Sequence, residues 1–268
     1  MKKERIDVLL TRLGHFDSRE SAKRAVMAGL ILVDQQRIDK PGEKVSVEAK
    51  VTVKGKGCPY VSRGGFKLEK AIREFNLDLQ DKTIMDIGSS TGGFTDCALQ
   101  NKAKRSYAID VGYNQLAWKI RQDERVVCME RTNFRYLTAA ALKYGLPEFA
   151  CIDVSFISLK LILPVLKNLL QKEGEIVALI KPQFEAGREQ VGKKGIVRDA
   201  NIHIKVVQEL LDFITDLDLS VLGLTYSPIK GGVGNIEFLV HIGYHEKVKT
   251  CVSRELIVEI VNEAHQQL

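Results

Sequence analysis

The stretch from Thr83 to Thr95 constrains the fold of this chain more than any other part of its sequence. Thr83 to Ile87 is rich in apolar residues and predicts a short buried strand. Gly88 ends this strand, the pair Gly92-Gly93 permits a tight turn, and a helix is expected from Phe94. A strand, a glycine loop and a helix N-terminus gather backbone N–H groups around one pocket, which suits a nucleotide or a carboxylate.

The spacing within this loop narrows the class of ligand. It lacks the Gly-x-Gly-x-x-Gly of dinucleotide enzymes and the Gly-Lys-Ser/Thr of a P-loop. The next expected strand, Arg105 to Asp110, ends in a carboxylate, which can accept both hydroxyls of a ribose. A glycine loop followed by such an acid points to an adenosine cofactor without a pyrophosphate, namely S-adenosyl-L-methionine. The alternative is an ordinary turn between a strand and a helix.

Alternating strands and helices around this loop predict the fold class. Strands are expected at residues 83–87, 105–110, 125–130, 148–154, 175–180, 219–226 and 236–242. Helices are expected at residues 66–75, 92–101, 113–122, 158–171, 201–216 and 251–266. This alternation predicts an α/β fold with a mostly parallel, seven-stranded sheet. The last two strands are too close in sequence for a crossover and should form an antiparallel hairpin, as in Rossmann-like methyltransferases.

Residues 1–56 predict a small α+β domain that carries most of the positive charge. The net charge of the chain is +6, and residues 1–56 hold 13 Lys or Arg against 8 Asp or Glu. Two short helices followed by a strand-rich half resemble the S4-type RNA-binding domain, and a generic basic appendage is the alternative. A linker is expected at residues 57–63 and the methyltransferase domain at residues 64–268. Positive charge attracts RNA phosphates, so RNA contacts are expected from Arg5, Arg12, Arg19, Lys23, Arg24 and Arg63.

Cysteine usage and hydropathy exclude several classes of protein. The five cysteines are scattered and form no Cys-x-x-Cys, so neither a disulfide framework nor a metal site is expected. The N-terminus lacks the apolar core of a signal peptide, and no uncharged apolar run is long enough to span a bilayer. A reducing, cytoplasmic location without membrane contact is therefore expected.

Four charged residues are predicted to meet at the carboxyl edge of the sheet, where ligands bind in open α/β folds. Asp153 and Lys181 lie at the ends of two parallel strands, Glu237 begins the antiparallel last strand, and Lys67 begins the helix before the first strand. Transfer of an activated methyl group mainly needs in-line positioning and removal of the proton of the acceptor. A ribose hydroxyl is a very weak acid, so a lysine that burial and a neighbouring lysine keep neutral suits it as the base. Each residue alone also has an ordinary structural explanation, such as a lysine reaching solvent.

Other methyltransferase chemistries leave different marks in a sequence. Amine methylation commonly uses Asn/Asp-Pro-Pro-aromatic after the fourth strand, where this chain has Asp153-Val154-Ser155-Phe156. Methylation of a pyrimidine carbon needs a cysteine nucleophile, whereas Cys151 lies inside an expected strand and is interpreted as core. A hydroxyl acceptor therefore agrees best with these residues.

Motifs along nearly the whole chain resemble the TlyA (hemolysin A) family. They are Val61-Ser62-Arg63-Gly64-Gly65-x-Lys67-Leu68, Asp86-x-Gly88-x-Ser90-Thr91-Gly92-Gly93-Phe94-Thr95, Asp110-Val111-Gly112-Tyr113, Gln115-Leu116-Ala117-Trp118, Glu130-Arg131-Thr132-Asn133, Asp153-x-Ser155-Phe156-Ile157-Ser158, Lys181-Pro182-Gln183-Phe184-Glu185 and Gly234-Asn235-x-Glu237. One departure lies in the linker, where Cys58-Pro59-Tyr60-Val61 stands in place of the Arg-Ala-Trp-Val of some relatives.

The resemblance implies a ribosomal RNA 2′-O-methyltransferase that acts on cytidine in ribosomal subunits, with an FtsJ-like catalytic domain. It implies a catalytic tetrad of Lys67, Asp153, Lys181 and Glu237 and favours Lys181 as the base. It also implies contacts to S-adenosyl-L-methionine from Asp86, Gly88, Ser89, Ser90, Thr91, Gly92, Gly93, Phe94, Asp110, Asn133 and Asp153.

Two alternatives come from other functional classes. The second name of the family suggests a membrane-active cytolysin, but the sequence has no secretion signal and no apolar span. An RNA-binding ribosome-assembly factor without catalysis is the other, and the complete tetrad argues against it.

Overall fold

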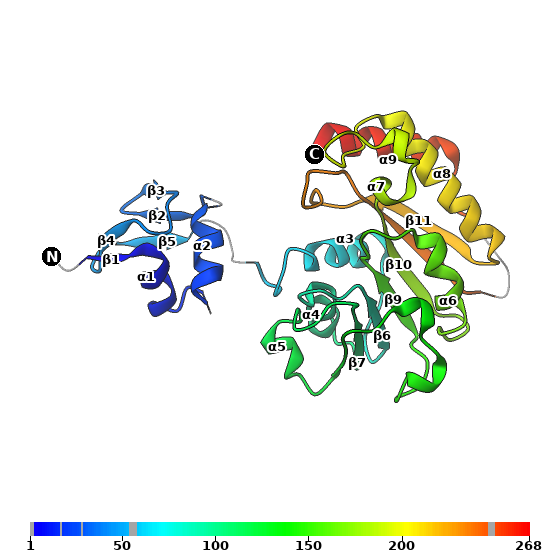
Figure 1. Ribbon diagram of the computed structural model, residues 1–268, viewed down its shortest axis with the longest axis horizontal. Coiled ribbons are helices and arrows are strands. Elements are labelled where there is room, and N and C mark those ends of the chain that lie inside the picture. Colours follow the sequence, from blue (N-terminus) through cyan, green and yellow to red (C-terminus); the bar gives the residue numbers. More distant parts are fainter. Residues whose placement is uncertain (1–2, 17, 28, 54–57, 246–249) are drawn as a thin grey trace. The chain divides into compact units, whose positions relative to one another are not determined.

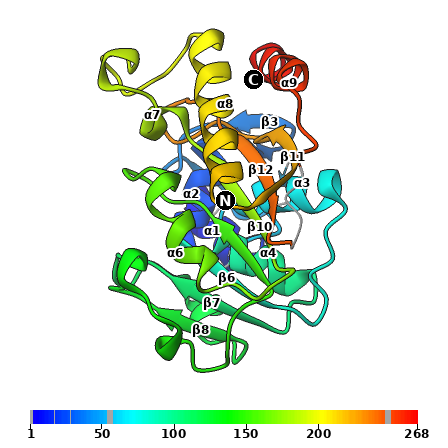
Figure 2. The same cartoon turned by 90° about the vertical axis from the view of Figure 1, so that its right-hand side faces the viewer.

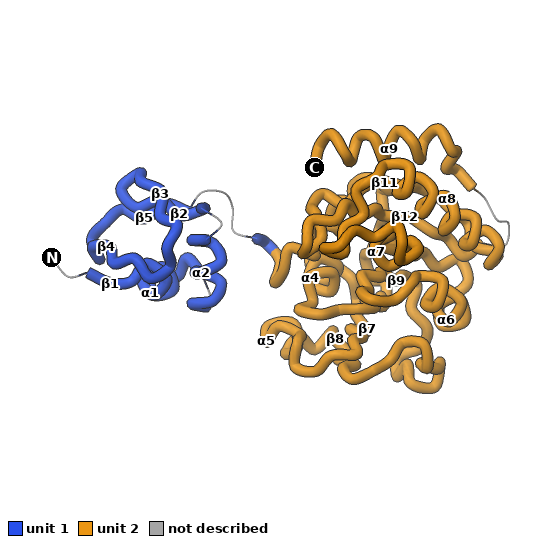
Figure 3. Tube along the Cα trace, turned by 45° about the horizontal axis from the view of Figure 1, so that its top comes forward, with its two compact units in different colours: residues 1–59 blue, residues 60–268 orange. Residues whose placement is uncertain are grey.

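The chain divides into two units, residues 1–59 and residues 60–268 (Figure 3). The computed structural model describes residues 3–16, 18–27, 29–53, 58–245 and 250–268. Residues 54–57, where the expected N-terminal domain meets its linker, lie outside the described residues.

The N-terminal unit combines two short helices with two small sheets (Figure 1). Its elements are β1 (Lys3–Arg5), α1 (Ile6–Arg12), α2 (Arg19–Met27), β2 (Ile31–Val33), β3 (Gln36–Ile38), β4 (Lys44–Ser46) and β5 (Val51–Val53). The order β3-β2-β5 is antiparallel, and β1 pairs with β4. Apolar residues of both helices and of the strands, including Ile6, Leu10 and Val26, form its own core.

A buried carboxylate ties this small unit together. The side chain of Asp7 is inaccessible to solvent, and both its oxygens accept hydrogen bonds from the Arg5 guanidinium at 3.0 Å. Arg19 of α2 donates a further hydrogen bond of 2.9 Å to the same carboxylate. The hydrogen bonds from Arg5 and Arg19 outweigh burial and lower the pKa of Asp7 to about 2. Asp7 therefore joins β1, α1 and α2 through charge-assisted hydrogen bonds.

The second unit alternates strands and helices. Its strands are β6 (Thr83–Ile87), β7 (Arg105–Ile109), β8 (Val126–Met129), β9 (Phe149–Ile152), β10 (Glu175–Ile180), β11 (Ser220–Tyr226) and β12 (Phe238–Gly243). Its α-helices are α3 (Gly65–Phe75), α4 (Gly93–Gln100), α5 (Trp118–Arg121), α6 (Leu163–Lys167), α7 (Pro182–Glu185), α8 (Ala200–Asp216) and α9 (Arg254–Gln267). Short 3₁₀ turns lie at η1 (Phe134–Tyr136), η2 (Ala139–Ala141), η3 (Leu159–Leu161) and η4 (Arg188–Gln190). In the described ranges, every helix is too short or too polar to cross a bilayer.

The sheet has the predicted topology. Its order is β11-β12-β10-β9-β6-β7-β8, and all neighbours are parallel except for β12, which is antiparallel to β10 and β11. The order starts at β6 in the centre and reverses direction at β9, so a crevice lies beyond the carboxyl ends of these two strands. The expected Rossmann-like sheet with a terminal antiparallel hairpin is confirmed.

Helices cover both faces of the sheet (Figure 2), and the side chains of the strands alternate between one hydrophobic core on each face. Ile84, Phe149 and Cys151 face α3 and α4, whereas Met85 and Ile152 face the core that contains α6, α8 and α9. Cys151 is fully buried, as expected for a core residue. Because both faces of the sheet are covered, these strands are nearly continuous apolar runs, and such runs are what predicted them.

Two expected helices are wrong in extent. Of residues 113–122, only Trp118–Arg121 are helical, because the Glu130 carboxylate accepts the backbone N–H groups of Gln115 and Leu116 in a loop. Of residues 158–171, the structure forms only η3 and then α6, which has Pro164 in its first turn. A proline lacks the N–H for an interior helical hydrogen bond, so a continuous helix cannot run through this position.

Replacing Asp7 by Ala should destabilise the N-terminal unit by about 2 kcal/mol, because several charge-assisted hydrogen bonds are lost. Since the pKa of Asp7 is lowered on folding, its contribution should be complete above about pH 4 and disappear as the pH falls toward 2. Hydrogen exchange of residues 3–53 by mass spectrometry measures this change. Glu4→Ala is the matched control, since it removes the exposed ion pair with Arg12 and should have little effect. Equal exchange in both variants would contradict the role of Asp7.

Candidate active site

The glycine loop between β6 and α4 packs directly against the end of β9. Gly88 has a φ of +82°, and a Cβ atom there would lie 2.7 Å from the carbonyl oxygen of Asp153. Both the conformation and the close approach therefore require glycine at this position. The backbone N–H of Ser90 donates to Asp110 Oδ2 at 2.8 Å, and that of Gly112 donates to Asp110 Oδ1 at 2.7 Å. These bonds fix the carboxylate of Asp110 at the mouth of the loop.

Asp86 anchors the other end of the loop from beneath. Its Oδ2 accepts hydrogen bonds from the backbone N–H and the hydroxyl of Thr95, at 3.0 and 2.7 Å. Burial raises the pKa of Asp86 to about 7 despite these two bonds. Asp86 therefore holds the start of α4 against β6, and its carboxyl is almost inaccessible to solvent.

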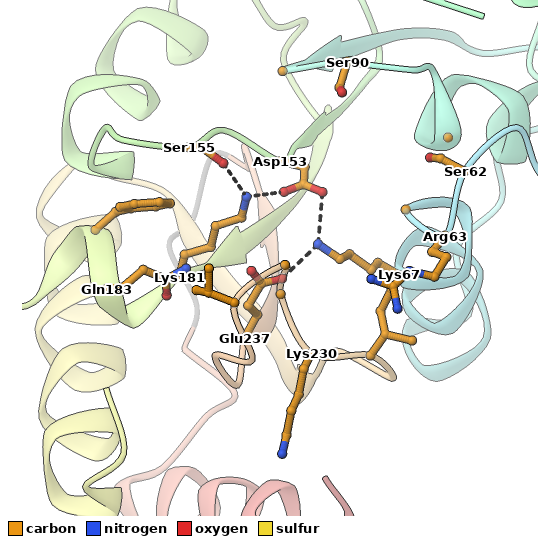
Figure 4. A pocket seen from close by; sticks show the side chains of 18 of the residues that line it. Ser62, Arg63, Lys67, Ser90, Asp153, Ser155, Lys181, Gln183, Lys230 and Glu237 are labelled. Carbon is orange, nitrogen blue, oxygen red and sulfur yellow. Dashed lines mark hydrogen bonds and ion pairs between the residues drawn. The ribbon is translucent and has the colours of Figure 1, made fainter. Parts of the chain in front are cut away.

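The four charged residues predicted to converge are joined by ion pairs in one cluster, which we call the charged tetrad (Lys67, Asp153, Lys181 and Glu237; Figure 4). Lys67 Nζ lies 3.1 Å from Asp153 Oδ2 and 2.8 Å from Glu237 Oε2. Lys181 Nζ lies 2.6 Å from Asp153 Oδ1. The Asp153 carboxylate is thus shared by two ammonium groups that come from α3 and from the end of β10.

Burial and ion pairing oppose each other in the charged tetrad. Burial alone would lower the pKa of Lys67, but Asp153 and Glu237 outweigh it and raise this pKa. Burial likewise acts to raise the pKa of Asp153, and Lys67 and Lys181 outweigh it and lower the pKa. Lys67 is therefore held in its charged form and Asp153 in its ionised form at neutral pH.

Two adjoining cavities meet beside the charged tetrad. The first, of about 640 Å³, is lined by all four tetrad residues, by Arg63 and by most of the glycine loop. The second, of about 350 Å³, is lined by Asp110, Asn133 and the apolar side chains of Ile109, Val111 and Phe134. The two cavities share Gly88, Ser90, Asp153, Ser155 and Phe156 in their walls. A ligand in the second cavity can therefore reach the tetrad.

The residues of the second cavity fit an adenosine group. Its walls combine apolar side chains for a flat base with one carboxylate for ribose hydroxyls. The expected contacts Ser89, Thr91, Gly93 and Phe94 line the first cavity. Gly92 instead packs behind the loop, where a Cβ atom would lie 2.9 Å from Leu116, and Asn133 also accepts a hydrogen bond from the backbone of Arg135.

Two residues for which the sequence predicted no role line the site. Ser155 Oγ lies 3.1 Å from Lys181 Nζ, so it adds a hydrogen bond to the tetrad. Phe156 has a φ of +64° and is 91% exposed, although it is a large apolar residue. A left-handed conformation is unfavourable for phenylalanine, and such strain is often kept at functional positions. The motif contained both residues, but sequence alone does not distinguish an exposed phenylalanine from a core one.

The cations expected to bind RNA differ in their surroundings. Arg5 and Arg19 are paired with the buried Asp7, as described above. Arg12 and Lys23 form pairs with Glu4 and Glu20 at the surface. For Arg24 and Arg63 the described ranges contain no carboxylate within ion-pair distance.

Comparison with known proteins matches a known family model to each of the two units. The FtsJ-like methyltransferase family model matches residues 60–244, and the S4 domain model matches residues 4–51. The protein YqxC of Bacillus subtilis, named as an rRNA methyltransferase, is 58% identical over 100% of this chain and 96% of its own. The 16S/23S rRNA (cytidine-2′-O)-methyltransferase TlyA of Mycobacterium tuberculosis is 38% identical over 89% of each chain.

Solved structures of similar proteins also include relatives with hemolysin and methyltransferase names. A Streptococcus thermophilus protein assigned to the hemolysins has a TM-score of 0.80 and 54% identity, over 100% of this chain and 97% of that one. An S-adenosylmethionine-dependent methyltransferase from Listeria monocytogenes, at 15% identity, shares the fold of the second unit with a TM-score of 0.51, over 69% of this chain and 100% of that one. With an FtsJ-like methyltransferase unit, an S4 domain and TlyA relatives that match most of its length, the chain belongs to the TlyA (hemolysin A) family of methyltransferases.

Proposed function

We propose that this protein methylates the ribose 2′-hydroxyl of a nucleotide in ribosomal RNA, with S-adenosyl-L-methionine as methyl donor. The observation that carries the proposal is the common wall of the two cavities. Asp110 lines one cavity, the charged tetrad lines the other, and Gly88 and Asp153 line both. A nucleoside cofactor and a hydroxyl acceptor can therefore meet at this wall.

The cofactor would be held by Asp110 at its ribose hydroxyls, by Asn133 beside its base and by the glycine loop. S-adenosyl-L-methionine supplies a methyl group that is already activated by the sulfonium charge. The protein therefore contributes orientation and a base, rather than a covalent intermediate.

Lys181 is the residue of the tetrad that suits the role of base. Lys67 is held charged by two carboxylates, whereas Lys181 has Asp153 as its carboxylate partner and Ser155 as a hydroxyl partner. In its neutral form Lys181 takes the proton of the acceptor hydroxyl at Nζ. Lys67 keeps Asp153 and Glu237 oriented while this proton moves.

RNA as the acceptor is supported by the S4 domain, by the basic N-terminal unit and by the printed activity of the TlyA relative. That relative acts on cytidine, so cytidine is the nucleoside that we propose. The exposed ring of Phe156 lies at the wall between the cavities, where it offers a surface for stacking of an unpaired base.

Lys181→Ala should lower the rate of methyl transfer by about 10²- to 10⁴-fold, because the general base is lost. Lys181→Arg should be similarly inactive, because arginine keeps the charge but cannot become neutral at working pH. Transfer of tritiated methyl to ribosomal subunits that lack the modification measures this, with Lys205→Ala, an exposed lysine of α8, as control. Wild-type turnover of Lys181→Arg would exclude Lys181 as the base.

Asp110→Ala should weaken binding of S-adenosyl-L-methionine by about 1.5–3 kcal/mol, the cost of losing a charge-assisted hydrogen bond to the ribose. Asp110→Asn should have an intermediate affinity, since it keeps one acceptor oxygen. Titration calorimetry measures both, and Asp123→Ala, which removes a surface carboxylate paired with Arg125, is the control. If the affinities of Asp110→Ala and Asp123→Ala are equal, the ribose assignment is wrong.

Replacing Arg12, Lys23 and Arg24 by Gln should flatten the salt dependence of RNA binding. Each lost phosphate contact reduces the slope of log affinity against log salt by about 0.7–0.9. A triple variant at Arg73, Lys205 and Arg254 removes the same charge from the catalytic unit and serves as control. Salt titrations with the same ribosomal RNA compare them. A slope that falls only in the control would place the RNA contacts outside the N-terminal unit.

A further inference from the structure

One wall of the first cavity is formed by two loops that the proposed mechanism does not use. The segment between η4 and α8 contributes Val191, Lys194 and Gly195. The segment between β11 and β12 contributes residues 229–233. Both segments line the same cavity as the charged tetrad, and Figure 4 shows Lys230 of the second segment below Glu237, with its side chain directed away from the tetrad.

Gly232 is a glycine for which the protein itself gives no structural reason. Among the described ranges, every other glycine has either a φ in the left-handed region or an atom within 4 Å of the position of a Cβ. Gly232 has neither: its φ lies outside that region, and a Cβ atom would meet nothing within 4 Å. Gly232 is one of the residues that line the cavity containing the tetrad. Glycine is typical of positions where a backbone approaches a ligand closely.

The backbone next to Gly232 is in contact with the tetrad. A Cβ atom on Gly231 would lie 2.5 Å from Glu237 Oε1, so the peptide chain passes directly beside this carboxylate. The carbonyl of Glu237 accepts a hydrogen bond of 2.8 Å from the backbone of Ser227 at the start of the loop. The position of the loop is therefore fixed relative to the tetrad.

A buried asparagine joins this loop to the other one. Asn235 is fully buried, its Oδ1 accepts from the backbone N–H of Val197 at 3.0 Å, and its Nδ2 donates to the carbonyl of Gly195 at 2.8 Å. His203 of α8 contacts the same segment between η4 and α8. Its Nε2 lies 3.2 Å from the Val197 carbonyl oxygen, and its Nδ1 lies 2.9 Å from His265 Nε2. The two loops and the helices behind them therefore form one braced wall.

We infer that residues 229–233 form the subsite for the acceptor nucleoside, with Gly232 as a specificity-determining residue and Asn235 as a positioning residue. This inference rests on the proposed function and deepens it by assigning where the sugar and base of the acceptor lie. The absent side chain of Gly232 leaves the volume that a ribonucleoside unit of an RNA chain fills against the peptide backbone. Asn235 keeps that surface at a fixed distance from Glu237 and Lys181.

Gly232→Ala and Gly232→Val test the subsite by graded bulk. A Cβ atom at position 232 meets no protein atom within 4 Å, so the thermal unfolding midpoint and the affinity for S-adenosyl-L-methionine of Gly232→Ala should equal those of the wild type, and both are measured for Gly232→Val as well. Misplacement of an acceptor by about 1 Å can cost 10²-fold in rate, so methyl transfer to unmodified ribosomal subunits should fall by about 10-fold in the Ala variant and 10²-fold in the Val variant.

Gly187→Ala is the matched control for these variants. Gly187 has a φ of −60°, a Cβ atom there would meet only the end of the Glu189 side chain, and the residue lies outside the lining of the cavity. Its activity should equal that of the wild type. Wild-type transfer rates in Gly232→Val would overturn the subsite and leave the proposed function intact. A wild-type protein that transfers no methyl group would overturn both.

Asn235→Ala tests the positioning role. It should lower kcat for methyl transfer by at least 10-fold, with unchanged affinity for S-adenosyl-L-methionine and an unchanged KM for ribosomal subunits. Asn101→Ala is the control, because Asn101 also bonds to the backbone, at the carbonyl of Cys97, far from these loops. The unfolding midpoints of both variants are measured alongside. If the loss of kcat in Asn235→Ala follows its loss of stability as it does in Asn101→Ala, Asn235 is merely structural.

Discussion

The shared carboxylate of Asp153 is the interaction on which the rest of the catalytic unit depends. Two ammonium groups, from Lys67 and Lys181, lie within 3.1 Å of it in a site that is largely closed to solvent. Burying any one of these charges without its partners costs several kcal/mol. These charges can therefore be buried only together, which requires that the carboxyl ends of β9 and β10 and the start of α3 meet. The same strand end packs against Gly88, so the glycine loop is positioned by the same contact.

The N-terminal unit also has one carboxylate that is shared by two cationic side chains, but these cations are more exposed to solvent. Asp7 is buried, but Arg5 and Arg19 that bind it keep about half of their side chains exposed. Their guanidinium groups are held in place by hydrogen bonds to this carboxylate. In the second unit the lysines of the tetrad are themselves buried. The N-terminal arrangement leaves its cations half exposed at the surface, and the other arrangement encloses its cations around a cavity.

Sequence alone predicted the strands and the place of the tetrad, and the reasons are local. Strands β6 to β10 are short apolar runs whose side chains alternate between two cores, and the ends of parallel strands necessarily share one edge of the sheet. Residues 113–117 could not be predicted in the same way, because the Glu130 carboxylate that accepts the backbone N–H groups of Gln115 and Leu116 comes from a separate part of the chain. The hydrogen bond between Asn235 and Val197 also joins distant segments, so the motif Gly234-Asn235-x-Glu237 did not predict it. The exposure of Phe156 depends on a left-handed backbone that no periodic pattern encodes.

The long span of the tetrad along the chain affects the order in which the protein acquires its parts during translation. The ion pair between Lys67 and Glu237 joins residues 170 positions apart. By contrast, the N-terminal unit has all its strands once Val53 has been made. At about 5–20 residues per second, a ribosome adds the intervening segment in roughly 10 to 35 seconds. For that time the nascent chain carries a basic N-terminal unit without the charged tetrad, and a chain that is cut or stalled before Glu237 never acquires the tetrad.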